Sequence, residues 1–499
     1  MKRSLLTLSL LTSLANAQPL KSCIEEVIAT NPVVQERLKN YNAAKEDLSI
    51  AKSGYYPKLD LSLGFGIEKT EKSAQLNPAN NQSYSFSVYQ NSLKLTQNIF
   101  KGWDTTYQVE GQEAKSLSSA YSYVEKVNDI AFQMVNAYIQ VMKQRELLEN
   151  SKSNVEINEE IFKKVQKLYE AGLTTLSEVN KIESSLALAK SNYVVQENTL
   201  LDTLYSFQKL LGRTIEPAKL SKPELTVAMP ASLEEALTYA IENNPSLLVS
   251  QYNIKTAQAT YNQNRSPFYP HIDIEISESM NKNLSAVEGE DTKFRAMVYL
   301  NYNIFNGFAD SATLQKSISQ VHQEVESKNE LRRQVIEGLS LSWAANEKLK
   351  HQLDHLVAYK DFSLKTLTLY AKEYDLGRRS LLDLLSAQND FIGAKSQIIN
   401  TEYSLLYAKY RILDALGTLV PTVLGDEELV YSNVGLAGAA PSALDSLPLR
   451  YDRDNDLIAD DADLCANSLP TEMKNIFGCA ESDLKIAKIE RYGGFTFKS

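Results

Sequence analysis

Apolar positions recur along the chain with two different periods, and the two periods alternate in blocks. Between residues 58 and 100 apolar side chains tend to occupy every second position, and the same alternation returns between 271 and 305. A period of two is typical of a β-strand with one apolar and one polar face. A polar stretch interrupts each block, EKSAQLNPANNQ in the first and NKNLSAVEGEDT in the second. The pattern therefore predicts two β-hairpins, at 58–100 and 271–305.

A helical period follows each predicted hairpin, over residues 104–212 and 309–417. Apolar residues recur there at steps of three and four, which places them on one stripe of an α-helix. In the first block the helical pattern continues to Glu170, which gives a rod of roughly 100 Å at ~1.5 Å per residue. Gly172 and Gly377 interrupt the two blocks, and glycine is favoured where the backbone reverses. Each block is therefore expected to be a long helical hairpin.

The chain contains an internal duplication. Asn-Pro and Tyr-Pro pairs recur at a displacement of 213 residues, and after the hairpins the displacement becomes 205. The landmarks are Asn31-Pro32 and Asn244-Pro245, Tyr56-Pro57 and Tyr269-Pro270, and then NIFKGW at 98–103 and NIFNGF at 303–308. The change of eight residues falls within the first hairpin, where a loop tolerates it best. We therefore expect two homologous repeats, at 18–212 and 232–420, joined by a linker at 213–231.

Each repeat is expected to begin with a helix, at about 23–53 and 232–263, before its hairpin. After the hairpin, Gly102 and Gly307 are expected to let the backbone change from strand to helix.

The N-terminal residues have the composition of a secretory signal peptide. Lys2 and Arg3 precede an apolar stretch that ends in Ala-Asn-Ala, so cleavage is expected before Gln18 and the signal peptide spans 1–17. Lipidation of Cys23 is an alternative, although Lys21 stands where a small residue would be expected. No later stretch holds 18 apolar residues, so no transmembrane helix is predicted.

Charge and motif content exclude several classes of function. The formal net charge is −10 and no cluster of Lys and Arg occurs, which argues against nucleic-acid binding. No nucleophile elbow, phosphate loop or HExxH motif occurs. His351 and His355, four residues apart, could share a metal ion, but on a long exposed helix a solvated pair is the preferred interpretation. We therefore do not expect an enzyme, and we expect no cofactor for transport.

The predicted hairpins supply only four strands per chain. A sheet that spans a bilayer must close on itself, and four strands are too few, whereas three copies would supply twelve. The alternation then gives an apolar outer wall and a wet inner face. A soluble sheet packed on the helices is the alternative.

The repeated motifs resemble those of the TolC family of outer-membrane export channels. They are the Asn-Pro and Tyr-Pro pairs, the NIF phrases and the turn Y-x-x-G-x-R-S-L-L-D-L at 374–384, and the resemblance covers about 23–420. It implies an α+β membrane protein: a homotrimer with a twelve-stranded outer-membrane β-barrel, continued by a long periplasmic α-helical barrel.

The same resemblance implies passive conduction, in an efflux pump or a type I secretion system of a Gram-negative bacterium. Exported proteins or small molecules would arrive from an inner-membrane ABC or proton-driven transporter that is joined through a periplasmic adaptor (membrane fusion) protein. A periplasmic coiled-coil scaffold or adaptor without a pore is the alternative from another class.

The resemblance also places a periplasmic gate at the turns between the long helices. Its residues are Tyr374, Arg379, Asp383, Ser177 and Glu178. A guanidinium binds a carboxylate bidentately, so Arg379 is expected to hold a carboxylate such as Glu178 across neighbouring hairpins. A second acidic position of the family is Ser386 here, which puts an acidic constriction in doubt beyond Asp383. The alternative is that these are solvated turn residues with no role in gating.

The C-terminal region is expected to be a linker at 421–450 and an acidic tail at 451–499. The spacing of five tail carboxylates suits calcium, which takes many oxygen ligands in loose geometry. They are Asp452, Asp454, Asp456, Asp460 and Asp463. Leu457 departs from the glycine of an EF-hand. The stretch resembles a thrombospondin type 3 repeat instead, and a solvated acidic linker is the alternative.

The chain has three cysteines. Cys465 and Cys479 lie close together in the tail, where an oxidising compartment favours a disulfide. Cys23 is then left unpaired, as a small buried residue at the start of the first helix.

Overall fold

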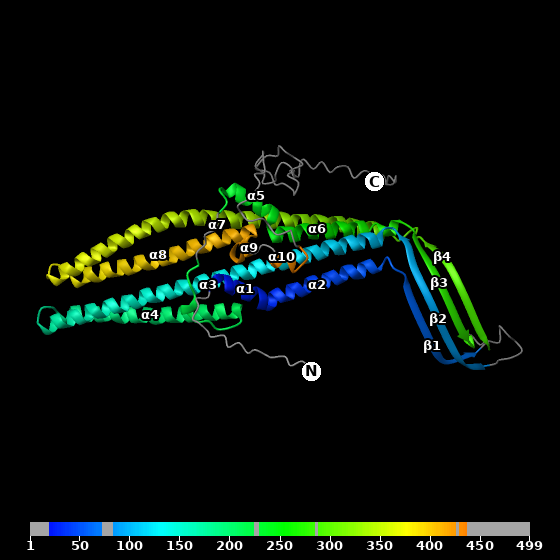
Figure 1. Ribbon diagram of the computed structural model, residues 1–499, viewed down its shortest axis with the longest axis horizontal. Helices are drawn as coiled ribbons and strands as arrows, with labels where there is room; N and C mark the ends of the chain where they lie inside the picture. Colours follow the sequence, from blue (N-terminus) through cyan, green and yellow to red (C-terminus); the bar gives the residue numbers. More distant parts are fainter. Residues whose placement is uncertain (1–18, 72–82, 224–228, 285–287, 426–428, 437–499) are drawn as a thin grey trace, which may run out of the picture. The chain divides into compact units, whose positions relative to one another are not determined.

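A computed structural model describes residues 19–71, 83–223, 229–284, 288–425 and 429–436. These residues form long helices and a four-stranded sheet, and they divide into two compact units (Figure 1). The sheet unit lies within residues 39–119 and 248–329, and the other described residues form the helical unit. The predicted signal peptide at 1–17, the tail carboxylates at 452–463, Cys465 and Cys479 lie outside the described residues.

The sheet is antiparallel throughout, in the order β1-β2-β3-β4. Its strands are β1 (Lys58–Glu71), β2 (Ser83–Lys101), β3 (His271–Lys282) and β4 (Glu290–Asn301). The two hairpins of the two repeats are joined by the pairing of β2 with β3, which contains a bulge between Asn98 and Phe100. β1 and β4 are therefore the two edges of the sheet in a single chain.

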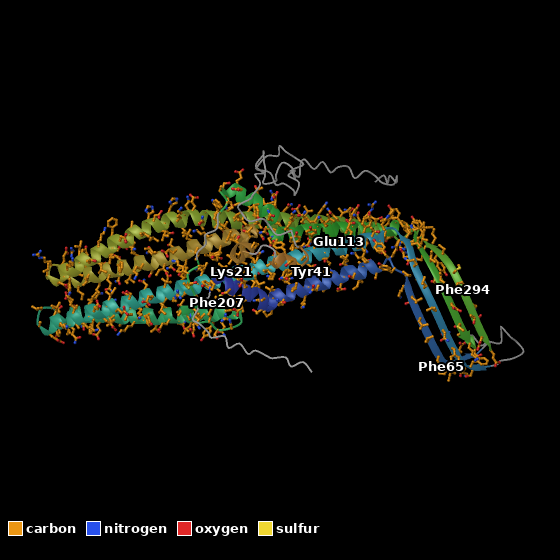
Figure 2. All side chains as sticks on the ribbon, viewed as in Figure 1. Lys21, Tyr41, Phe65, Glu113, Phe207 and Phe294 are labelled. Atoms are coloured by element: carbon orange, nitrogen blue, oxygen red, sulfur yellow. The ribbon has the colours of Figure 1, made fainter. Side chains whose placement is uncertain are left out.

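Alternation along the strands gives the sheet one apolar and one polar face. Leu95 lies opposite Leu59 on one side and Ile276 on the other, and Ile276 lies opposite Ala296. Phe65 and Phe294, labelled on the two edge strands in Figure 2, belong to the same face, and their side chains are 74% and 69% exposed. Polar side chains pair on the opposite face: the Lys94 ammonium lies 2.6 Å from Glu275, and the Asn98 amide donates to Asp273 at 2.7 Å.

The helices of the sheet unit continue from its strands. They are the C-terminal part of α2 (Pro32–Ser53), most of α6 (Pro245–Gln263), and the first turns of α3 (Asp104–Glu170) and α7 (Ala309–Asp375). The Gln263 amide donates to Asp104 at 3.0 Å, and Asn264 donates to the Ser317 hydroxyl at 2.7 Å. These bonds fix the starts of the two long helices beside the 3-10 turn at Ser266–Phe268.

Two long helical hairpins dominate the helical unit, α3 with α4 (Leu176–Leu211) and α7 with α8 (Leu381–Leu416) (Figure 1). α3 contacts α4 through the hydrogen bond of Ser185 to Asn158, 3.0 Å. It contacts α8 through the hydrogen bond of Tyr403 to Glu146, 2.5 Å. Helix α3 of the first repeat thus contacts α4 of its own repeat and α8 of the second repeat.

Shorter helices complete the helical unit: α1 (Leu20–Thr30), α5 (Leu233–Asn243), α9 (Leu419–Leu424) and α10 (Leu429–Ser432). The first helix of each predicted repeat divides in two at its Asn-Pro pair, because proline lacks the N–H that a continuous helix would use. α9 and α10 occupy part of the segment at 421–450 that was expected to be a linker. None of the helices in the described ranges is long and apolar enough to cross a membrane.

Cys23 lies inside α1 with none of its surface exposed, as a free thiol. Burial raises the pKa of this thiol to about 11. A lipid chain on the sulfur would have no room, which argues against the lipidation alternative.

The second NIF phrase departs from the predicted hairpin at 271–305. β4 ends at Asn301, whereas the first NIF phrase lies within β2. β4 has a neighbour on one side only, so nothing extends its ladder beyond Asn301. The Asn303 side chain instead accepts a hydrogen bond from the backbone N–H of Phe305 at 3.1 Å.

Candidate functional site

The turns of the two helical hairpins have the same backbone geometry. Gly172 follows α3 with φ +73°, and Gly377 follows α7 with φ +67°. In each turn the backbone N–H groups of the glycine and of the residue after it donate hydrogen bonds to carbonyls in the last turn of the long helix. The N–O distances are 2.8 to 2.9 Å. Glycine adopts this left-handed backbone without a steric penalty. Both glycines therefore lie in the turns between the paired helices.

Apolar side chains from all four long helices pack together beside these turns. The cluster, which we call the tip core, has Tyr374 as its one aromatic buried member. Its buried residues are Ile161, Val165, Ile182, Tyr374, Leu381, Leu384 and Leu385. Removal of this surface from water holds the two hairpins side by side.

Polar contacts cross from one hairpin to the other around the tip core. The Tyr374 hydroxyl on α7 donates to the Glu178 carboxylate on α4 at 3.4 Å, and Thr174 also bonds to Glu178. Burial and the adjacent Glu178 raise the pKa of Tyr374 to about 12. A second link joins Lys164 on α3 to Asp375 on α7. These two polar links therefore join α7 to the first hairpin at the tip.

Arg379 does not pair with Glu178, contrary to the sequence expectation. Its guanidinium binds Glu373 at 2.9 and 2.8 Å and lies 4.1 Å from the centre of the Tyr370 ring. Asp383 lies 4.0 Å away on the other side. Glu373 precedes Arg379 by only six residues, and the turn brings the two together, so the guanidinium is occupied within its own hairpin.

The remaining predicted tip residues have local positions. The Asp383 N–H donates to the Ser380 side chain at 3.2 Å, and the Ser380 hydroxyl donates back to the Asp383 carboxylate at 2.8 Å, which caps α8. Ser177 is exposed in the first turn of α4, and His351 and His355 are exposed on α7. Sequence reasoning missed Lys164 and Asp375, because no motif marks two residues that meet only when the hairpins pack.

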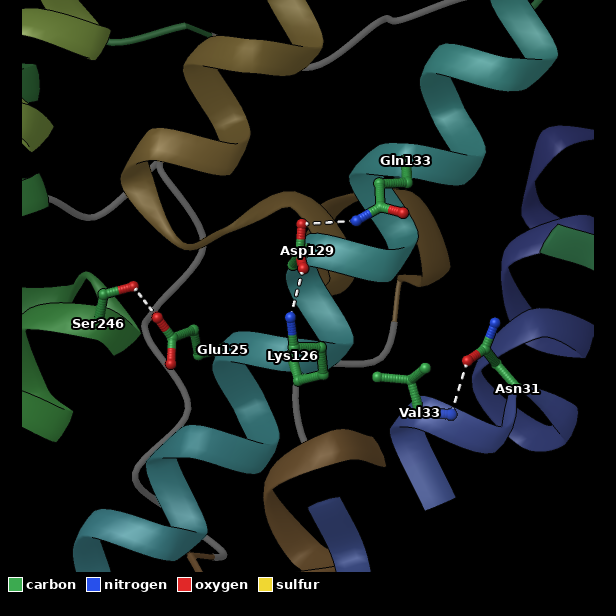
Figure 3. Close-up of polar contacts among 7 residues, drawn as sticks. All are labelled: Asn31, Val33, Glu125, Lys126, Asp129, Gln133 and Ser246. Atoms are coloured by element: carbon green, nitrogen blue, oxygen red, sulfur yellow. Dashed lines mark hydrogen bonds and ion pairs between the residues drawn. The ribbon is translucent and has the colours of Figure 1, made fainter. Parts of the chain in front are cut away.

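A polar pocket of about 570 Å³ lies elsewhere in the helical unit. Residues of α2, α3, α6, α7 and α8 line it. Figure 3 shows the contacts of one lining residue, Asp129, which accepts hydrogen bonds from Lys126 at 2.7 Å and Gln133 at 2.9 Å. The Asp414 carboxyl also lines this pocket, and its burial, together with the charge of Asp129, raises its pKa to about 7. Arg411 opposes this rise.

Asp414→Asn is expected to stabilise the protein above pH 7. An ordinary aspartate has a pKa of 3.8, so between about 3.8 and 7 the folded state holds a proton that the unfolded state has lost. Stability therefore falls as the pH rises through this window, and the asparagine variant removes that fall, by about 4 kcal/mol at pH 8. Urea unfolding at pH 5 and pH 8 measures it, with the exposed Asp202→Asn as control. An equal pH dependence in Asp414→Asn and wild type would contradict the assignment.

The paired hairpins and sheet segments match a known family. Residues 23–213 and 236–418 fit the sequence model described as outer membrane efflux protein. The chain belongs to this family. Among similar proteins, the outer membrane efflux protein BepC of Brucella suis is 22% identical over 385 residues, which cover 76% of this chain and 81% of BepC. The outer membrane protein TolC of Escherichia coli is 23% identical over 449 residues, covering 83% and 85%.

The fold is also that of solved channels. The structure of the Campylobacter jejuni CmeC outer membrane channel superposes with a TM-score of 0.72 at 13% identity, over 84% of this chain and 89% of CmeC. This outer membrane efflux protein is therefore a TolC-family export channel of the Gram-negative outer membrane, not an enzyme. Channels of the family are homotrimers that work with periplasmic adaptors and inner-membrane transporters, in efflux pumps and in type I secretion.

Proposed function

We propose that the contact between the two helical hairpins is the periplasmic gate of this channel. The observation that carries the proposal is the pair of links across the tip core, Tyr374 with Glu178 and Lys164 with Asp375. Both join a helix of the first repeat to α7 of the second. Separation of the hairpins breaks both links at once, and cargo then passes without an energy source in the channel itself.

The two links and the Arg379 contacts have different roles in this gate. Tyr374 is buried, so its hydroxyl binds Glu178 away from bulk water, where a hydrogen bond to a charged acceptor contributes more than at the surface. Arg379, Glu373 and Asp383 belong to one hairpin and order its turn. Tyr374, Glu178, Lys164 and Asp375 hold the closed state, and Arg379 shapes the surface that a partner meets. Recordings of single trimers in planar bilayers test the gate.

We further propose that β4 of one copy pairs with β1 of the partner subunit in the register of β2 with β3. The matched segments 23–213 and 236–418 support two repeats at 18–212 and 232–420. The displacement of 205 relates Asn98 to Asn303, and the displacement of 213 relates Asp273 to Asp60. The hydrogen bond of Asn98 to Asp273 therefore has a counterpart between the same two residue types, Asn303 of one copy and Asp60 of the partner subunit. The apolar face then meets lipid, and the polar face lines the pore.

A cysteine pair tests this register. Thr96 lies opposite Glu275, so Asn301 is expected opposite Ser62 of the partner subunit. The double variant Asn301→Cys with Ser62→Cys should form disulfide-linked trimers, which non-reducing gels detect. Asn301→Cys with Asp60→Cys, two residues out of register, is the control. Linkage of the control pair, with none in the first pair, would contradict the register.

Calcium binding by the tail at 451–499 also remains our proposal, supported by the spacing of its aspartates. Among the described residues no group of three metal-binding side chains occurs. Titration of the full chain with calcium in a calorimeter tests it. If the wild-type chain gave no more heat than the double variant Asp452→Asn with Asp454→Asn, the calcium site would be ruled out.

A further inference from the structure

α4 and α7 each carry apolar side chains that a single chain leaves exposed. On α7, Phe362 is 65% exposed, and on α4, Tyr205 is 65% exposed. Others follow along the same helices: Leu341, Tyr359 and Leu369 on α7, and Leu188, Val194 and Leu201 on α4. Monomeric proteins rarely leave such extended apolar stripes open, so these faces fit a partner.

The contact of α3 with α8 within the chain provides a template for that partner. The Asn150 amide on α3 donates to the Ile392 carbonyl at 3.2 Å and to the Ser396 hydroxyl at 2.8 Å. The Tyr403 hydroxyl donates to Glu146 at 2.5 Å. One turn further, Gln388 donates to Asn154 at 3.0 Å.

The internal duplication carries this template onto α7 and α4. α7 is the second-repeat counterpart of α3, and α4 is the first-repeat counterpart of α8, both at a displacement of 205 residues. The α3 residues correspond to His351, His355 and Tyr359 on α7. The α8 residues correspond to Glu183, Ala187, Ser191 and Asn198 on α4. All seven counterparts are exposed in the single chain, on the helices that carry the apolar stripes.

We propose that α7 of each copy packs against α4 of the partner subunit as α3 packs against α8, with His351 and His355 at the centre of this contact. We call it the α7–α4 seam, and it rests on the trimer of the proposed channel. His355 then donates to Ser191 or the Ala187 carbonyl of the partner subunit. His351 pairs with Asn198 of the partner subunit, and Tyr359 donates to Glu183 of the partner subunit.

The two histidines make this seam sensitive to acid. A neutral imidazole has one N–H donor and one nitrogen acceptor, which are enough to make the hydrogen bonds of the α3–α8 contact. An imidazole gains a second proton between pH 5 and 8. Packing of the seam withdraws the ring from water, which penalises the charged form. Two imidazolium groups at i and i+4 also repel each other. Protonation therefore loosens the seam.

The charged groups around the histidines do not reverse this effect, because they have other partners. On α7, Glu347 pairs with Lys348 at 3.0 Å and also interacts with His351, which opposes part of the effect by favouring the charged imidazole. On α4, Lys190 pairs with Glu159 at 2.9 Å and Glu197 bonds to Tyr193. On α8, Glu402 pairs with Lys222 at 2.6 Å, and Lys395 lies over the Phe391 ring. Lys350 lies on α7 beside His351 and adds positive charge.

Three further carboxylates lie near the histidines: Glu183 of the partner subunit accepts from Tyr359, Asp202 of the partner subunit accepts from Asn198 at 3.2 Å, and the last is Asp354. Its first-repeat counterpart is Glu149, whose charge acts on Tyr193 of α4. By the same correspondence Asp354 faces α8 of its own chain rather than the seam. It therefore provides a matched control position one residue from His355.

Disulfide linkage tests the packing of the seam. His355→Cys with Ser191→Cys should give covalent dimers and trimers on non-reducing gels, while Asp354→Cys with Ser191→Cys should give far less. If trimers form on native gels but neither pair links, or the control links equally well, the seam is wrong and the trimer stands. If no trimers form in the wild type, the proposed channel itself fails.

Trimer dissociation at two pH values tests the histidines. Wild-type trimers in detergent are expected to dissociate about tenfold faster at pH 5.5 than at pH 7.5, equivalent to ~1.4 kcal/mol. His351→Gln with His355→Asn should remove this difference, since neither replacement gains a proton and asparagine is the residue of the template at the second position. His322→Gln, an exposed histidine elsewhere on α7, should keep it. An undiminished pH effect in the double variant would overturn the role of the histidines.

Discussion

Lys164→Met combined with Tyr374→Phe is expected to give a channel that stands open at rest. The phenylalanine keeps the ring in the tip core and removes only the hydroxyl that binds Glu178, and the methionine removes the charge that faces Asp375. Loss of the two links costs the closed state about 1 kcal/mol per chain. Three chains acting together shift the closed–open ratio by about a hundredfold. Single-channel conductance and the leakage of large antibiotics into cells measure the shift.

Arg379→Ser is the matched control for this experiment. Its guanidinium binds Glu373 within one hairpin, so its loss loosens the turn without breaking a link between hairpins. We expect a smaller increase in conductance than in the double variant. A larger effect from Arg379→Ser would show that the turn, rather than the contact between hairpins, controls the gate, and an unchanged conductance in both variants would end the gating proposal.

Gly102→Ala is expected to reduce the amount of assembled channel severely. Gly102 has φ +59°, and an added Cβ would lie 2.6 Å from the Ser266 carbonyl oxygen, closer than real contacts allow. Backbone strain and this clash together cost about 3 kcal/mol or more, since the contacted group is backbone and cannot turn away. The yield of heat-modifiable trimers in outer-membrane fractions measures the loss.

Gly172→Ala separates strain from clash. Gly172 has φ +73°, but a Cβ there would meet nothing within 4 Å. Strain alone costs about 1 kcal/mol, so most of the trimers should persist. Equal losses in the two variants would mean that the close approach to Ser266 has no part in the effect.

The sequence predicts those parts of this fold that depend on local periodicity. A helical period and a glycine at a left-handed position are properties of neighbouring residues, and α3 and its turn at Gly172 follow from them. The fold class, with its two sheet hairpins and long helices, could be read from the duplication.

The partners of side chains could not be predicted in the same way. Arg379 has several carboxylates within reach of a tip turn, and only the folded turn selects Glu373 over Glu178. Lys164 and Asp375 meet across two hairpins without any motif. The end of β4 at Asn301 depends on what lies beside the strand, which no pattern within the strand records.

The early end of β4 has a consequence for biogenesis. A lone chain carries two unpaired strand edges and an apolar sheet face, which is the surface that promotes aggregation in the aqueous periplasm. Extension of β4 into the second NIF phrase requires a strand of the partner subunit beside it. Folding of the sheet and assembly of the trimer are therefore expected to occur together. A lone chain is therefore expected to aggregate more readily than the assembled trimer.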